Sequence, residues 1–279
     1  MDDRKVPFFS IFRETLLFLF TDMRRLKKLT AVPVIFTGFA SLLFVFLPDT
    51  PMTFELTKET VAPALLLFVL FLLYVATMVQ THTVIFYRDS EGYFIPAANK
   101  EAIKKTVYYA YLFFKTLFAG WILSTLFIIL LYLIFSFFFD VSIVKPQYVP
   151  TFGILCTPFF VIRFCMIFPA SAAGEKKSLY AAWKMTAGNT LSLNIFYMLS
   201  FLTPLILGVS AALMMSGTTV MPLFIGFAKN FASNLSLLFA CVTQAAFMSY
   251  LFLYVRQTES IEMTSDKSIL SLAKDKESD

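Results

Sequence analysis

The chain has 279 residues, of which 58% are hydrophobic and only 15% are charged, and its formal net charge is +5. Soluble domains carry about a quarter charged residues, so this composition excludes an ordinary water-soluble fold. It predicts an integral membrane protein.

The basic residues form short patches beside apolar segments rather than one continuous basic stretch. Cations in such positions typically contact anionic lipid headgroups. We therefore expect membrane lipids and other membrane proteins as partners, and no nucleic acid.

The first segment, residues 1–29, is predicted to be an amphipathic cytoplasmic surface helix. On a helix, Phe9 and Phe12 lie opposite Glu14 and Arg25. A helix with this pattern lies in the membrane interface with its apolar face toward the acyl chains.

Six apolar runs follow, at residues 31–47, 61–86, 113–139, 151–170, 191–215 and 231–255. Each is about as long as the 17–25 residues that cross a ~30 Å hydrocarbon core as a helix. The segments 96–107 and 178–187 are expected to be further amphipathic interfacial helices. The predicted fold is an all-α polytopic transmembrane helical bundle of about six spans over residues 30–256. The polar stretch 257–279 is predicted to be a disordered cytoplasmic tail.

Lysine and arginine are distributed unequally between the two sides that six crossings would define. Eighteen of the 23 lie before the first span, between spans two and three, between spans four and five, or after the sixth. Only three lie in the other loops, so the positive-inside rule predicts a multi-pass protein of the cell inner membrane with both termini cytoplasmic. The residues expected to contact headgroups are Arg24, Arg25, Lys27, Lys28, Lys104, Lys105, Lys176 and Lys177.

Tyrosines lie at the ends of two predicted spans. Tyr108, Tyr109 and Tyr111 precede the third, and Tyr250 and Tyr254 close the sixth. Tyrosine rings are enriched at the headgroup boundary, so all five are expected to be interfacial anchors.

Arg163 lies inside the fourth apolar run, which contains no acidic residue. An intramembrane arginine costs at least ~2.5 kcal/mol unless it snorkels, pairs or faces water. Two interpretations stay open. Its position about two turns before the inner boundary favours snorkelling or headgroup contact, and the alternative is a place on a path for a solute or lipid.

His82 is the only histidine, and no second histidine, cysteine or carboxylate lies near it at ligand spacing. This isolation favours a structural, hydrogen-bonded histidine over metal binding or proton transfer. We expect no metal and no cofactor.

Four amide side chains in or beside the last two spans are further candidates, namely Asn189, Asn194, Asn234 and Gln244. Such groups usually hydrogen-bond between helices and sometimes line a substrate path. Small residues four apart, Gly208 with Ala212 and Ser236 with Ala240, predict close contact between the fifth and sixth spans.

The sequence contains no HExxH, no GxSxG and no glycine-rich phosphate loop. An intramembrane hydrolase would also need a nucleophile and a general base close together within the membrane, and the sequence shows no such pair. We therefore predict that the protein is not an enzyme.

Several motifs resemble the YciC-like family of bacterial inner-membrane proteins. The central one is a span ending in a proline-containing strip, residues 162–170, followed by the Ser/Ala/Trp/Thr/Asn pattern of residues 178–189. Residues 11–15, 230–235 and 250–257 also resemble the ends of that family. Related six-span domains occur fused to glycerophosphodiester phosphodiesterases, so the resemblance implies a lipid-facing accessory role.

The function predicted is that of a non-enzymatic integral inner-membrane protein of accessory or assembly type, related to lipids or to the envelope. The alternative is a transporter or permease subunit with a polar path near Arg163 and the last two spans.

Overall fold

The computed structural model describes residues 7–46, 58–87, 100–138, 149–199, 206, 210 and 222–277, and within them the chain forms helices and no strand. The helices are α1 (Phe8–Thr21), α2 (Met23–Phe46), α3 (Lys58–Phe86), α4 (Lys100–Phe138), α5 (Val149–Val161), η2 (Ile162–Phe164), α6 (Ile167–Ala172), α7 (Leu179–Met185) and α9 (Pro222–Glu277), with an unlabelled helix at Thr190–Leu199. The predicted all-α fold is confirmed. A helix satisfies its own backbone hydrogen bonds, which a segment surrounded by lipid requires.

Within the described residues, four helices are long and apolar enough to cross a membrane, at Met23–Phe46, Val61–Phe86, Ile103–Ile134 and Phe224–Thr258. The predicted fourth and fifth spans correspond to shorter apolar segments, Cys156–Ala172 and Thr190–Leu199. The chain is therefore a membrane protein by the length and composition of its helices. Six crossings remain a prediction, because most of the predicted fifth span lies outside the described residues.

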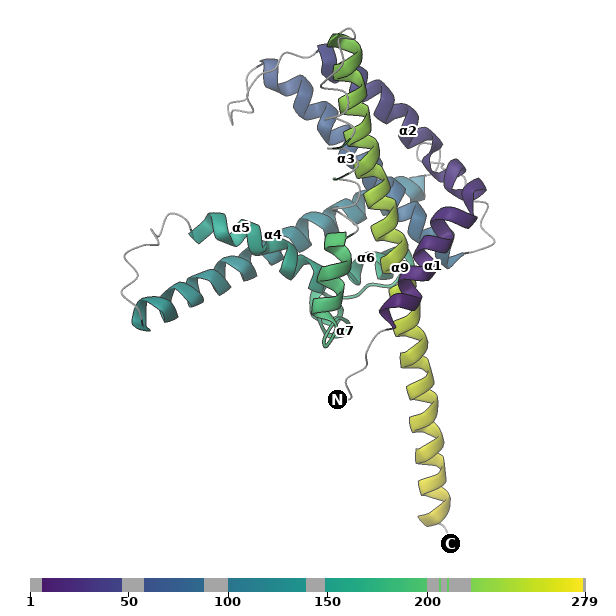
Figure 1. Cartoon of the computed structure of the whole chain (residues 1–279). Helices are drawn as coiled ribbons and strands as arrows, with labels where there is room; N and C mark the ends of the chain where they lie inside the picture. The colour runs from purple at the N-terminus through teal and green to yellow at the C-terminus, as the bar shows by residue number, and fades with distance from the viewer. Residues whose placement is uncertain are drawn as a thin grey trace.

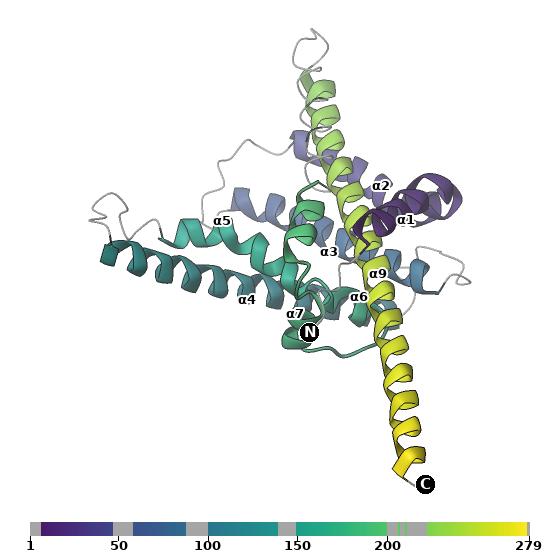
Figure 2. The same ribbon diagram turned by 60° about the horizontal axis from the view of Figure 1, so that its bottom comes forward.

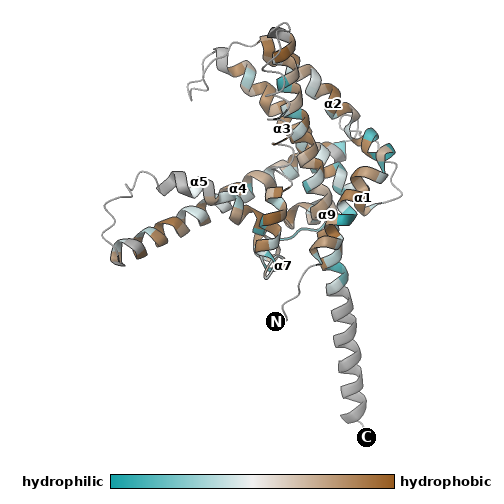
Figure 3. Cartoon of the chain, in the orientation of Figure 1, coloured by the Kyte–Doolittle hydropathy of each residue, from teal (hydrophilic) through white to brown (hydrophobic). Residues whose placement is uncertain are grey.

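Many large apolar residues of these helices are exposed, and hydrophobic residues run along most of the helix lengths in Figure 3. On α4, Phe118 is 62% exposed and Leu126 is 57% exposed. A protein in water rarely exposes a contiguous apolar surface of this extent, whereas acyl chains cover it in a bilayer. The apolar excess of the sequence is thus explained by contact with lipid as well as by the core.

Helix α9 forms the axis of the molecule and contacts α1, α2, α3 and α6. The pair α4 and α5 packs together along its length and extends away from this group, as Figures 1 and 2 show from two directions. The main core lies where α1, α3, α4, α6 and α9 meet. There, the Tyr109 and Phe168 rings pack together, and Phe196 stacks on Phe247.

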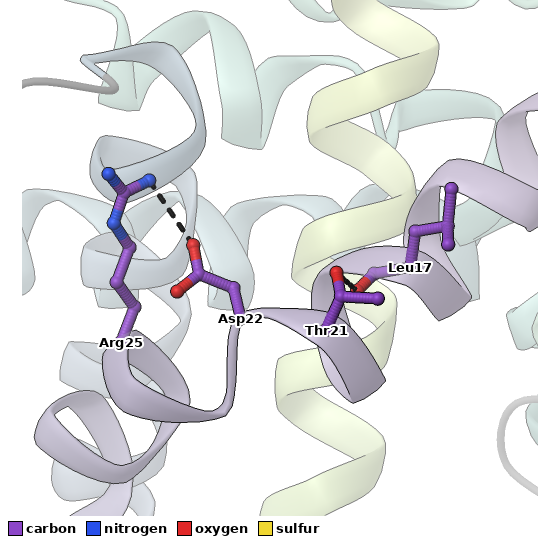
Figure 4. Close-up of polar contacts among 4 residues, drawn as sticks. All are labelled: Leu17, Thr21, Asp22 and Arg25. Atoms are coloured by element: carbon purple, nitrogen blue, oxygen red, sulfur yellow. Dashed lines mark hydrogen bonds and ion pairs between the residues drawn. The ribbon is translucent and has the colours of Figure 1, made fainter.

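The first segment differs from the single surface helix predicted for residues 1–29. Helix α1 ends at Thr21, the chain turns at Asp22, and α2 begins at Met23, so the basic cluster after it belongs to α2. The Asp22 carbonyl accepts from the Leu26 amide at 3.0 Å. Figure 4 shows Arg25 directed back to Asp22, with Nη1 3.3 Å from Oδ2. This ion pair joins side chains at the corner and in the first turn of α2.

Two further boundaries differ from the sequence-based prediction. Residues 100–107 are the beginning of α4 and are continuous with the predicted third span. Residues 257–277 continue α9, where composition predicts a disordered tail. No glycine or proline follows Gly226, so nothing in the sequence stops a helix that the membrane segment has already nucleated.

Candidate functional site

The predicted fourth span changes helix type at Arg163. It runs as α5 to Val161, tightens into η2 and resumes as α6. Pro169 has no N–H for the Cys165 carbonyl, which accepts instead from the Phe168 amide at 3.3 Å. This three-residue spacing is that of a 3₁₀ turn, so the proline prevents regular α-helical bonding directly after η2.

The Arg163 side chain caps the end of the neighbouring helix α7. Its Nη1 donates to the Thr186 carbonyl at 2.6 Å and to the Thr190 hydroxyl at 2.5 Å. Its Nη2 donates to the Trp183 carbonyl at 3.0 Å. The last carbonyls of a helix have no partner within it, and a cation stabilises that end, so the guanidinium supplies both hydrogen bonds and charge.

Two further contacts complete this cluster. The Thr186 hydroxyl donates back to the Arg163 carbonyl at 2.8 Å, and the guanidinium lies over the Trp183 ring at 4.4 Å. Arg163 is 7% exposed, and no described carboxylate forms an ion pair with it. Backbone oxygens and an indole ring therefore replace the acidic partner that a buried arginine usually needs.

His82 joins three helices. Its Nδ1 lies 2.6 Å from the Ser249 hydroxyl on α9, and its Nε2 lies 2.9 Å from the Tyr109 hydroxyl on α4. Ser249 uses its own proton to donate to the Ala245 carbonyl at 2.9 Å. This pairing assigns the proton to Nδ1, with Nε2 accepting from Tyr109. Both ring nitrogens thus have a partner on a neighbouring helix.

The four amides are not brought together into one site. The Asn234 side chain on α9 donates to the Ser41 hydroxyl on α2 at 3.2 Å, and the Asn234 backbone carbonyl accepts from the Tyr74 hydroxyl on α3 at 3.1 Å. Asn194 donates to the Thr190 carbonyl at 2.8 Å within its own helix, and Asn189 to the Ala187 carbonyl at 3.4 Å.

Gln244 lines a small apolar cavity together with Cys165, Leu193, Phe196 and Tyr197. The cavity has space for about one water molecule. It is too small for a metabolite or a lipid chain.

The basic residues gather at one end of the helices, and we call this set the basic rim. Its members are Arg24, Arg25, Lys27, Lys28, Lys104, Lys105, Lys176, Lys177 and Arg256. The bonds from His82 to Tyr109 and Ser249 place the end of α3, the start of α4 and the last membrane turns of α9 at one level. Leu26 packs in the same cluster as Val84, which adds the start of α2.

The loop after α6 joins the rim through an ion pair between Glu175 and Arg256, whose Oε1 and Nη2 are 3.2 Å apart. The rim side chains are exposed or partly exposed, Lys104, Lys105 and Lys176 among the exposed ones. A set of cations at the end of membrane helices is suited to anionic headgroups.

The three tyrosines at the start of α4 lie on different faces of the helix. Tyr108 and Tyr111 are 44% and 56% exposed, as expected of interfacial residues. Tyr109 is 1% exposed and bonds His82, so the prediction that it is an anchor is wrong. Neighbouring residues on a helix point about 100° apart, which puts one of the three rings inside.

The partners of Arg163 and His82 cannot be inferred from the sequence. Tyr109 and Ser249 are 27 and 167 residues from His82. Thr186 and Trp183 belong to the family-like pattern of residues 178–189, and their spacing of three residues places both carbonyls within reach of one guanidinium.

Among the described residues, no group of three or more His, Cys, Asp or Glu is placed to hold a metal ion. Comparison of the whole chain with protein-family models, curated proteins and solved structures finds no match. The geometry of the chain itself is therefore the basis for a functional proposal.

Proposed function

We propose that this chain is a non-enzymatic accessory protein of a bacterial inner membrane, which binds anionic lipids of the cytoplasmic leaflet through its basic rim. The observation that carries the proposal is the convergence of basic residues from the start of α2, the start of α4, the loop after α6 and the end of the apolar part of α9. Both chain termini are proposed to be cytoplasmic.

Electrostatics supports lipid binding by this set. Each lysine or arginine near an anionic membrane surface contributes about 1 kcal/mol, and the effect is screened within about 10 Å at 0.1 M salt. The nine cations of the rim include two paired with Glu175 and one paired with Asp22. Arg24, Lys27, Lys104, Lys105 and Lys176 are exposed and form no ion pair among the described contacts, and such a number of cations is sufficient to enrich anionic lipids around the protein.

The polar groups at depth support an accessory role. Arg163 and His82 are engaged with neighbouring helices, and their bonds hold elements in place. The resemblance to the YciC-like family, proposed from the sequence, points in the same direction. Assembly of lipids or envelope proteins would need a stable scaffold with one charged face, and the described fold is suited to that.

The test measures binding of fluorescent phosphatidylglycerol and phosphatidylcholine to the purified full chain in detergent. We expect preference for phosphatidylglycerol, and at least about a tenfold loss of affinity when Arg24, Arg25, Lys27 and Lys28 are all replaced by Gln. Lys229→Gln, near the other end of α9, is the matched control and should leave affinity unchanged. Equal binding of both lipids, or an unaltered quadruple variant, would contradict the proposal.

A transporter or permease subunit is the second candidate, and one observation favours it. The helix breaks at η2 beside a buried charge, and transporters bind solutes at such breaks. Arg163→Leu should then abolish uptake of a solute in reconstituted vesicles, while Arg163→Lys retains part of it. The bonds of both Nη atoms to neighbouring backbone and hydroxyl oxygens favour the accessory function instead.

A further inference from the structure

The loop between α6 and α7 is held in a fixed conformation at the end of the apolar part of α9. Gly174 has a φ of +82°, a conformation that side-chain-bearing residues rarely adopt. The amides of Gly174 and Glu175 donate to the carbonyls of Ser171 and Ala170 at 3.0 and 2.8 Å. These bonds cap α6 and direct the next three residues, Glu175, Lys176 and Lys177, toward α9.

Two cations from different elements converge on one carboxylate in this loop. Arg256 Nη2 lies 3.2 Å from Glu175 Oε1, and Lys177 Nζ lies 3.7 Å from Oε2. The Lys177 ammonium also lies 5.8 Å from the centre of the Phe252 ring. An anion is thus already bound between the two cations, and it belongs to the chain itself.

We propose that Lys176, Lys177 and Arg256 form a specific site for the phosphate of an anionic lipid, and that Glu175 competes with that phosphate. This inference rests on the proposed function and assigns one site within the basic rim. Two of the positive charges pair with Glu175, and with Lys176 the four residues carry a net charge of +2. Lys176 is exposed and lies between Glu175 and Lys177 in the chain, so its ammonium is a third potential donor.

The ion pairs are open to exchange. The side chains of Arg256, Glu175 and Lys177 are 61%, 28% and 24% exposed, and ion pairs with this exposure are weak. A phosphate offers more acceptor oxygens than a carboxylate and forms bidentate bonds with arginine. Arg256 follows directly after the apolar stretch of α9, at the depth where lipid phosphates lie.

The test uses the full chain in detergent and fluorescent phosphatidylglycerol as the probe. Glu175→Gln removes the competing charge and should tighten binding about threefold, whereas Arg256→Gln should weaken it about fivefold. Lys176→Gln, which leaves the Glu175 pairs intact, should weaken binding about twofold. Lys229→Gln is the control at the other end of α9 and should have no effect.

Three results would overturn the site. One is unchanged phosphatidylglycerol binding in Glu175→Gln with lower thermal stability, which would make Glu175 a loop tether only. Another is unaltered binding in Arg256→Gln and Lys176→Gln. The third is displacement of the lipid by millimolar inorganic phosphate, but not by chloride at matched ionic strength, which would assign the site to a soluble anion.

The outcome separates this inference from the proposed function. If the quadruple α2 variant weakens binding and the Glu175 and Arg256 variants do not, the rim binds lipid and only the specific site is wrong. If phosphatidylglycerol and phosphatidylcholine bind equally to every variant, the proposed function itself is wrong.

Discussion

Arg163 and Thr186 exchange hydrogen bonds in both directions. The Arg163 side chain donates to the Thr186 carbonyl, and the Thr186 side chain donates to the Arg163 carbonyl. The backbone carbonyls at the break in the predicted fourth span and at the end of α7 thereby receive hydrogen bonds from each other's side chains. Arg163 joins two elements and supplies the partner groups that each lacks where its regular structure ends.

Replacement of Arg163 should therefore destabilise the fold. We expect Arg163→Leu to lower the free energy of unfolding by about 1–3 kcal/mol, because the Trp183 and Thr186 carbonyls lose the charged donor that links them to η2. The Thr186 hydroxyl and the Asn189 amide still donate to these two carbonyls, which limits the loss. Arg163→Lys should have an intermediate effect, because one ammonium cannot reproduce the planar fork. Thermal unfolding in detergent measures both.

Thr186→Val should cost about 1 kcal/mol through loss of the hydroxyl bond. The matched control is Thr243→Val, because the partly exposed Thr243 bonds only a carbonyl of its own helix among the described contacts. Combined with Arg163→Leu, Thr186→Val should cost less than the sum of the single changes. Strict additivity would show that the two bonds are independent.

The direction of the His82 network gives a spectroscopic prediction. The single histidine should be neutral, with its proton on Nδ1 and with Nε2 accepting from Tyr109. In ¹⁵N-histidine-labelled protein, one ring-nitrogen signal of the protonated type should come from Nδ1. A proton on Nε2 would contradict the assigned direction.

Loss of the Tyr109 hydroxyl, which donates to His82 Nε2, should lower the free energy of unfolding. Tyr109→Phe leaves a buried acceptor unpaired and should cost about 1–2 kcal/mol. Tyr108→Phe is the control on the exposed face of the same helix and should change stability by less than about 0.5 kcal/mol. Equal effects of the two substitutions would place Tyr109 outside any buried network.

Close packing of α4 on α5 depends on two glycines. A Cβ at Gly153 would lie 2.7 Å from Thr125 Oγ1 and 3.3 Å from its Cα, and one at Gly120 would lie 2.6 Å from Val161 Cγ2. Gly120 with Ser124, and Gly153 with Thr157, place small residues four apart on the two facing helices, and Ser124 bonds both residues of the second pair. Membrane helices approach closely at such pairs.

Gly153→Ala should therefore lower stability by about 1–3 kcal/mol through overpacking. Gly226→Ala is the control, because its Cβ would make an ordinary 3.5 Å contact with Val45. Thermal unfolding should show no loss for that variant, since alanine favours the helix. A Gly153→Ala variant as stable as the wild type would indicate that α4 and α5 are more loosely packed.

Composition and run length were sufficient to predict the helical class, since apolar runs of bilayer length have few other stable forms. They did not predict where helices join or break. The corner at Asp22 separates two helices within one amphipathic pattern, and residues 257–277 are helical although their composition is polar. Composition and run length alone mark neither boundary.

The candidate residues could be named from the sequence, but their partners could not. Arg163 and His82 stand out because charge and imidazole are rare in apolar runs, whereas Thr186, Ser249 and Tyr109 are common residue types at ordinary positions. The small-residue contact was predicted for the fifth and sixth spans, and Gly208 and Ala212 lie outside the described residues. The described close pairs lie on α4 and α5.

The central claim is that the basic rim lies at one membrane surface and faces the cytoplasm. Single cysteines at Lys27, Lys104, Lys176 and Lys229, in a background lacking the native cysteines, test it with a membrane-impermeant maleimide applied to spheroplasts. We predict that the first three react only after the membrane is permeabilised, and that Lys229→Cys reacts in intact spheroplasts. Labelling of any of the first three from outside, or their division between the two sides, would contradict the account.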